Sequence, residues 1–220
     1  MVAAEIRSGC VIVFARAPRP GAVKTRLIPL LGPEGSAALQ ARMTKHALSV
    51  ARKAHIGPVE LYCDPDCDDD FLRFCGSRYG ADLKPQADGD LGARMAAAAK
   101  AALTDHAHVV LIGSDCPALA TRHLRNADQA LRGGADVVLV PAEDGGYVLV
   151  GLSRFDERFF EDIGWGSESV LEQTRTRLRE LGWRWEELET LWDVDRPEDY
   201  RRLLAYRLLD GPATRSRHEC

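Results

Sequence analysis

Short apolar segments alternate with amphipathic segments along the chain, and this alternation limits the possible folds more than any other feature. The apolar segments, which we predict as strands, are residues 11–14, 59–63, 109–112, 137–140, 147–150 and 188–192. Apolar residues at helical spacing predict helices over residues 36–54, 69–79, 93–103, 121–131, 167–181 and 197–209. Asp68 and Thr121 are the predicted caps of the second and fourth helices. This order predicts an α/β fold, a mostly parallel central sheet with helices on both faces.

Length and composition favour a single enzyme domain and argue against several other classes of protein. We expect one catalytic domain over residues 10–210, between an N-terminal extension of residues 1–9 and a flexible tail of residues 211–220. The net charge of −4 and the pI near 5.9 argue against a nucleic-acid-binding protein, which is typically basic. No apolar stretch approaches the roughly 20 residues of a membrane helix, and residues 1–9 lack the apolar core of a signal peptide.

The six cysteines indicate reduced thiols rather than a disulfide framework. Cys63, Cys67 and Cys75 are close in sequence, but their spacing matches no standard zinc-binding pattern. We therefore expect a cytoplasmic protein with structural thiols and no membrane segment, and we leave its oligomeric state open.

The loop after the first predicted strand concentrates positive charge. Its four cations are Arg16, Arg19, Lys24 and Arg26. Two prolines and Gly21 keep these cations off a regular helix. Open α/β sheets bind ligands at the carboxyl ends of their strands, and Arg and Lys suit phosphate oxygens. We therefore predict a polyphosphate site that also includes Ala15 and Thr25, with a solvated basic loop as the alternative.

Two common nucleotide-binding motifs are absent. Residues 21–25 resemble the end of a P-loop, but Val23 stands where that motif requires a glycine before Lys24. The first predicted strand is also not followed by Gly-x-Gly-x-x-Gly, the dinucleotide-binding fingerprint. The phosphate site predicted here therefore belongs to neither class.

Two acidic positions are candidate ligands of a divalent cation. Asp115 follows the buried strand 109–112, and Mg²⁺ is usually held by one or two carboxylates together with substrate phosphates. Asp195, or Asp193 on the same side of an extended segment, is the candidate second ligand. The alternatives are an Asp turn at Asp115 and a helix cap at Asp195, which lies three residues before Glu198.

Two glycine-containing segments are further site candidates. Asp144 precedes Gly145 and Gly146 between two predicted strands, where it is either a general base for an acceptor or part of a hairpin turn. Gly92 stands at a predicted helix start with Arg94 close behind, where free amides bind an anion or a base edge; the alternative is a simple glycine cap.

Five ordered motifs between residues 10 and 205 resemble one protein family. They are residues 14–27, Asp90-Leu91-Gly92-Ala93-Arg94-Met95, Gly113-Ser114-Asp115-Cys116-Pro117, Pro141-Ala142-Glu143-Asp144-Gly145-Gly146-Tyr147 and Asp193-Val194-Asp195-Arg196-Pro197. The chain resembles a bacterial family of the nucleotide-diphospho-sugar transferase superfamily, whose members are often labelled glycosyltransferases and are in some cases linked to arsenosugar biosynthesis. Residues 24–27 also resemble the phosphate loop of 2-phospholactate guanylyltransferases.

The resemblance implies a GT-A fold with a nucleotide bound across the first half of the sheet. It implies that Asp115 is a metal ligand, with Asp195 often the second, so that Mg²⁺ or Mn²⁺ is the expected cofactor. We place the acceptor beside Asp144, Gly145, Gly146, Tyr147 and Trp165. The family usually has Trp-Ser-Thr before the late helix, whereas this chain has Trp165-Gly166-Ser167.

We predict a metal-dependent transferase whose partners are a nucleotide-activated substrate and a small-molecule acceptor. The family labels favour transfer of a sugar from a nucleotide-sugar, with Lys24 and Asp144 as the catalytic residues. Four loop cations favour a triphosphate, so pyrophosphate-releasing nucleotidyl transfer is the close alternative. A nucleotide-binding module without turnover is more distant, because it would not need both metal carboxylates.

Overall fold

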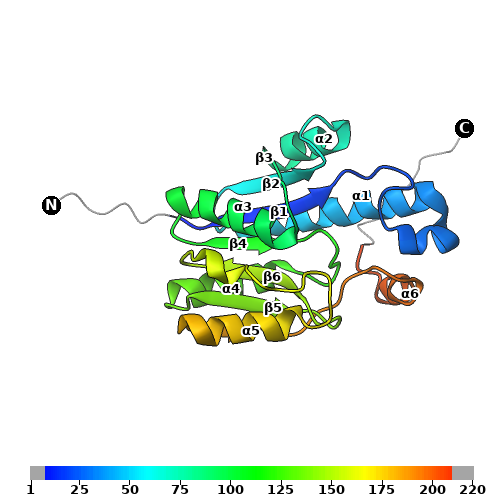
Figure 1. The fold of residues 1–220 in the computed structure, drawn as a ribbon. Coiled ribbons are helices and arrows are strands. Elements are labelled where there is room, and N and C mark those ends of the chain that lie inside the picture. The colour runs from blue at the N-terminus through cyan, green and yellow to red at the C-terminus, as the bar shows by residue number, and fades with distance from the viewer. Residues whose placement is uncertain (1–7, 210–220) are drawn as a thin grey trace, which may run out of the picture.

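The computed structural model describes residues 8–209, so the predicted tail of residues 211–220 and most of the predicted extension lie outside the described residues. Its seven strands form one sheet in the order β3-β2-β1-β4-β6-β5-β7 (Figure 1). They are β1 (Cys10–Arg16), β2 (Val59–Asp64), β3 (Ala81–Pro85), β4 (Val109–Ile112), β5 (Val137–Pro141), β6 (Tyr147–Leu152) and β7 (Trp185–Glu187). All neighbouring strands are parallel except β6, which runs antiparallel to β4 and β5.

Helices cover both faces of the sheet, which confirms the predicted fold class (Figure 1). They are α1 (Ile28–Ala54), α2 (Asp70–Tyr79), α3 (Leu91–Asp105), α4 (Thr121–Arg132), α5 (Val170–Leu181) and α6 (Pro197–Tyr206), with 3-10 turns η1 (Thr25–Leu27) and η2 (Glu157–Phe159). Apolar side chains of α1, α2 and α4 pack on one face, and those of α3 and α5 on the other. Burial of these two layers supplies the main stabilisation of the fold.

The predicted strands are present with one omission and one shift. β3 was not predicted, because its five residues, ADLKP, include two charged side chains and lack an apolar run. It is the edge of the sheet, where only one neighbour, β2, restricts its sequence. The strand predicted over 188–192 lies earlier, at β7, and Leu191 forms only an isolated bridge to Ala142.

Several helix ends differ from the prediction. Asp69, not Asp68, caps α2, because its carboxylate accepts the N–H groups of Phe71 and Leu72. Thr121 is the first residue of α4 rather than its cap, because Ala120 has the N-cap position and donates its N–H to Nδ1 of His123 at 2.8 Å. α1 begins before the predicted residue 36 and is interrupted at Gly32, where φ is +69°. α5 begins at Val170, three residues after the predicted Ser167.

The strand order of the sheet changes direction between β1 and β4. From β1 the chain adds β2 and β3 on one side, and it then returns to place β4 on the other side of β1. At such a switch point the loops after the two strands diverge to opposite faces and leave a crevice at the carboxyl ends. The predicted cationic loop follows β1 and the predicted metal ligand Asp115 follows β4, so both lie at this crevice.

The last helix completes this end of the molecule. Leu203 of α6 and Trp192 pack with Leu39 and Met43 of α1. This packing brings residues 193–195 to the crevice from the far end of the sequence. Within residues 8–209 no helix has the length and apolar character needed to cross a membrane, and the five described cysteines are free.

Candidate active site

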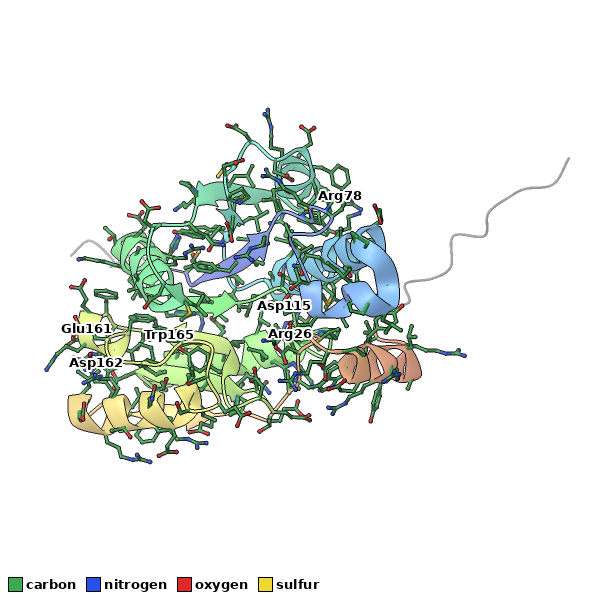
Figure 2. The ribbon with its side chains drawn as sticks, turned by 45° about the vertical axis from the view of Figure 1, so that its right-hand side comes forward. Arg26, Arg78, Asp115, Glu161, Asp162 and Trp165 are labelled. Atoms are coloured by element: carbon green, nitrogen blue, oxygen red, sulfur yellow. The ribbon has the colours of Figure 1, made fainter. Side chains whose placement is uncertain are left out.

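A cleft of about 860 Å³ opens at the carboxyl ends of β1 and β4. Its wall combines the cationic loop, the ends of β2 and β4, the start of α3, the start of β6, the loop before α5 and residues 193 and 195. Arg26, Asp115 and Trp165, labelled in Figure 2, all belong to this wall. The structure thus brings together segments that are up to 180 residues apart in the sequence.

Lys24 is the most constrained cation of the cleft. Its backbone has φ +47° and its side chain is 6% exposed. The ammonium group donates a hydrogen bond to the Val194 carbonyl at 2.6 Å and lies 3.0 Å from Oδ1 of Asp115. The Val194 N–H in turn donates to the Asp115 carbonyl at 2.9 Å. The loop after β1, the end of β4 and residues 193–195 are therefore joined at one point.

Arg26 pairs with the carboxylate of Asp195. The alternative prediction, that Asp195 is purely the cap of α6, is wrong. Arg196 has the N-cap position, and Oδ2 of Asp199 in the first turn accepts the N–H groups of Asp195 at 3.1 Å and Arg196 at 2.7 Å. The Asp195 side chain is therefore free of the helix and stays at the cleft.

Six aspartates line the cleft, and four of them follow β4, β5 or β7 in the sequence: Asp115, Asp144, Asp193 and Asp195. Burial, the Asp144 carboxylate and the Asp115 carboxylate raise the pKa of Asp193 to about 6, against the opposing effect of Lys24. The shift has two physical causes, of which burial of the carboxyl group is the larger and repulsion from the neighbouring carboxylates is the smaller. Oxygen donors that repel one another suit a hard divalent cation such as Mg²⁺.

These carboxylates nevertheless do not already surround a common point. Among residues 8–209, one group of three or more possible metal-binding side chains has all its ligand atoms within 4.8 Å of one another, and it consists of Cys10, Glu60 and His106. That group is at the amino end of β1, remote from the cleft.

One side of the cleft contains residues that we did not predict. Asp64, at the end of β2, lies 2.8 Å from Nε of Arg16 and 3.6 Å from Nη1 of Arg94. Gln86, just after β3, accepts a hydrogen bond from Arg94 at 3.3 Å. Asp64 follows an apolar strand as Asp115 does, so the same reasoning could have found it. Gln86 follows the strand that we missed.

The other side contains most of the predicted acceptor residues. Asp144, Gly146, Tyr147 and Trp165 line the cleft. Asp144 is exposed, and its Oδ1 accepts the N–H of Gly146 at 3.0 Å, so it takes part in the turn between β5 and β6 that the alternative interpretation predicts. The rings of Tyr147 and Trp165 meet edge to face with centroids 6.3 Å apart.

Four predicted residues do not line the cleft. Arg19 lies 3.5 Å from Asp69 and 3.9 Å from Asp66, and these ion pairs direct it away from the other loop cations. A Cβ added to Gly92 would lie 2.1 Å from Nε1 of Trp165, and one added to Gly145 would lie 2.1 Å from the Glu168 carbonyl. Both glycines therefore permit close packing of the loop before α5. Gly21 adopts φ +80° in the loop itself. The remaining predicted nucleotide residues, Ala15, Arg16, Lys24, Thr25, Arg26 and Arg94, belong to the wall.

Solved structures with this fold include both transferase types that we considered. A candidate nucleotide-diphospho-sugar transferase from Desulfovibrio desulfuricans G20 is 28% identical, with a TM-score of 0.79 over 91% of this chain and 93% of that one. CMP:2-keto-3-deoxy-manno-octonic acid synthetase in complex with CTP is 16% identical, with a TM-score of 0.56 over 91% and 99%. Glucosyl-3-phosphoglycerate synthase from Mycobacterium tuberculosis, with Mn²⁺ and UDP, is 12% identical, with a TM-score of 0.54 over 92% and 77%.

The fold is that of the nucleotide-dependent transferases. Residues 47–167 match the model of DUF2064, described as uncharacterized protein conserved in bacteria, and the chain belongs to this family. No curated protein sequence matches the chain. The matched segment includes Asp115, Asp144 and Trp165, but it ends before Asp195 and begins after the cationic loop.

Proposed function

We propose that this protein is a metal-dependent transferase that moves a sugar from a nucleotide-sugar to a small-molecule acceptor. The observation that carries this proposal is the Lys24–Asp115 pair, 3.0 Å apart at the β1/β4 crevice. This pair supports the proposal because a cation suited to phosphate and a carboxylate suited to a metal lie at one point, with the exposed Asp144 on the same wall.

The nucleotide occupies the side of the cleft formed by β1, β2 and α3. Phe14 and Leu91 offer apolar surface there, and Arg16, Asp64 and Gln86 offer hydrogen bonds for a base or ribose. The diphosphate then lies beside the loop at residues 24–26. Arg26 binds phosphate oxygens in bidentate fashion and Lys24 acts as a point charge, so both stabilise negative charge on the leaving group.

Asp115 and Asp195 would hold the divalent cation, with Asp193 as the alternative second ligand. Their carboxylate oxygens fit Mg²⁺ or Mn²⁺. Burial and then the Asp144 and Asp115 carboxylates raise the pKa of Asp193, and a bound cation would favour its charged form. When bound, the cation neutralises charge on the diphosphate leaving group. Asp115 must then exchange Lys24 for the metal, and Asp195 must exchange Arg26.

Asp144 acts as the base for the acceptor. The acceptor hydroxyl forms a bond to the anomeric carbon of the sugar, the bond from that carbon to the diphosphate oxygen breaks, and the hydroxyl proton passes to the Asp144 carboxylate. Tyr147 and Trp165 form the apolar wall beside it. Gly146 keeps side-chain atoms out of the space between Asp144 and this wall.

Nucleotidyl transfer from a nucleoside triphosphate is the second candidate, and the likeness to the CTP-bound synthetase favours it. The cations available in the cleft favour nucleotidyl transfer less than the four cations of the loop sequence did. Arg19 is directed away and Arg16 is paired with Asp64, so Lys24 and Arg26 are left for the phosphates. Lys24, Arg26 and one divalent metal carry four positive charges, and the carboxylates of Asp115 and Asp195 offset two of them. The two that remain match the diphosphate of a nucleotide-sugar better than the more highly charged triphosphate.

The products of turnover distinguish the two reactions. The purified protein is incubated with a panel of nucleotide-sugars, or with nucleoside triphosphates and sugar phosphates, in the presence of Mg²⁺ or Mn²⁺. Sugar transfer, or slow hydrolysis of the donor, releases a nucleoside diphosphate, whereas nucleotidyl transfer releases pyrophosphate. Neither product with any metal would contradict both candidates, and Asp115→Asn serves as the inactive control.

A further inference from the structure

A second group of chemically active side chains lies at the opposite end of the sheet from the cleft. Cys10 is the first residue of β1, Glu60 is the second residue of β2, and His106 directly follows α3. Their ligand atoms all lie within 4.8 Å of one another. Cys10 and Arg16 mark the two ends of β1, about 20 Å apart at roughly 3.3 Å per residue.

The fold brings these three side chains together for a simple reason. Cys10 and Ile12 project from the same face of β1, because side chains alternate along a strand. Glu60 is the register partner of Ile12 in β2, so it projects from that face as well. This is the face that α3 covers, and the N–H of His106 binds the Ala102 carbonyl at 3.0 Å where the helix ends.

Glu60 carries a buried oxygen without a partner. Its side chain is 7% exposed, and Oε1 lies 2.6 Å from the ammonium group of Lys84. Oε2 is fully buried and has no hydrogen-bond partner among residues 8–209. Burial of a carboxylate oxygen without a partner costs about 1–3 kcal/mol or more, so such an atom calls for an explanation.

We propose that Cys10, Glu60 and His106 bind one divalent transition-metal ion of the zinc type. Thiolate sulfur, imidazole nitrogen and carboxylate oxygen are all established zinc ligands, and the fourth position remains for water. A tetrahedral site with ligand distances of 2.0–2.3 Å separates neighbouring ligand atoms by roughly 3.5 Å. The ligand atoms of the three side chains, within 4.8 Å of one another, are near this separation.

The two oxygens of Glu60 then have separate partners. Oε1 keeps the Lys84 ammonium group, and Oε2 binds the metal. The Cys10 thiol releases its proton to solvent and binds as the thiolate. The ion ties β1, β2 and the end of α3 together at the end remote from the cleft, so its role is stabilisation of the fold rather than catalysis.

Titration with Co²⁺ alone tests this site. The full chain is stripped with a chelator and titrated, and the thiolate-to-cobalt charge-transfer absorption is recorded. We expect one equivalent to bind, Zn²⁺ to displace it and Mg²⁺ not to compete, because Mg²⁺ prefers oxygen ligands. Zn²⁺ should also raise the melting temperature of the wild type, since the metal binds only the folded chain.

Matched variants assign the ligands. Cys10→Ala and His106→Gln should each lose the absorption or weaken binding at least tenfold. Cys67→Ala removes a cysteine from the loop between β2 and α2 and should bind normally. Asp115→Asn should also bind normally, so failure here is distinct from failure of the cleft. His106 is only half-buried, so its variant folds even if Cys10→Ala does not. Absence of stoichiometric binding in the wild type, or unchanged binding by His106→Gln, would overturn the proposal.

Discussion

The two sides of the cleft hold their polar side chains in different ways. On the nucleotide side, each cation already has a carboxylate partner: Lys24 has Asp115, Arg26 has Asp195, and Arg16 has Asp64. On the acceptor side, Asp144 is held only by a hydrogen bond from the Gly146 backbone N–H.

This difference indicates how the two sides respond to ligands. Under the proposed function, the Lys24–Asp115 and Arg26–Asp195 pairs must be exchanged, so that each cation turns to phosphate as its carboxylate turns to the metal. We therefore expect metal and nucleotide to favour one another's binding on that side. Asp144 has no cationic ion-pair partner among residues 8–209, so the acceptor would meet an exposed carboxylate. Variants of the two sides should accordingly separate binding from turnover.

The largest effect is expected from Asp115→Asn. An amide oxygen lacks the charge that holds a divalent cation beside phosphate, so the dependence of nucleotide binding on Mg²⁺ or Mn²⁺ should disappear. Calorimetric titration of the nucleotide with and without the metal measures this. Asp162→Asn, an exposed acid whose ion pair with Arg177 lies outside the cleft, is the control and should respond like the wild type. An equal metal response in Asp115→Asn would remove Asp115 from the site.

The next effect concerns turnover on the acceptor side. Asp144→Ala and Asp144→Asn should both lower kcat by about 10²–10⁴, the usual loss for a general base, and should leave nucleotide affinity unchanged. Asn can still accept the Gly146 N–H, so only the Ala variant should lower the melting temperature. If Asp144→Asn keeps normal turnover, Asp144 is a turn residue and the base lies elsewhere.

A smaller effect is expected in the cationic loop. Lys24→Ala or Arg26→Ala should weaken nucleotide binding by about 1.5–3 kcal/mol, the scale of a charge-assisted hydrogen bond. Arg19→Ala removes the same charge from the same loop, but its ion pairs direct it away from the cleft, so affinity should stay unchanged. Equal losses in all three variants would mean that only the overall charge of the loop attracts the nucleotide.

The positions of these residues along the sheet were predictable, whereas the directions of their side chains were not. Apolar runs locate β1 and β4 in the sequence, and the rule for carboxyl ends is then enough to place Lys24 and Asp115 at one crevice. The prediction for Arg19 is wrong because this residue lies in an irregular loop, where no period relates sequence to direction. Its orientation depends on Asp66 and Asp69 of another loop, some fifty residues later.

Two further differences have the same physical origin. β3 is a short edge strand whose formation depends on pairing with β2, so its own sequence carries little of the signal. Gly92 has the position of a ligand-binding glycine, yet the space beside it is filled by Trp165 from a loop more than seventy residues later. Packing between segments that are distant in the sequence determined both outcomes. Local sequence patterns do not reveal such packing.

The smallest effects are expected from two aspartates at the start of α6. One is proposed to bind the metal, and the other accepts backbone N–H groups of the helix start. Asp199→Ala removes the acceptor of the Asp195 and Arg196 N–H groups, so it should cost about 1 kcal/mol of stability, as loss of a helix cap does. Asp195→Asn leaves this cap in place and should keep the melting temperature, while it weakens metal-dependent nucleotide binding by a few fold, since Asn remains an oxygen ligand. Melting and titration of both variants measure the two quantities on the same preparations. The opposite pattern, with stability lost in Asp195→Asn and affinity lost in Asp199→Ala, would return Asp195 to the role of a cap and leave Asp193 as the second metal ligand.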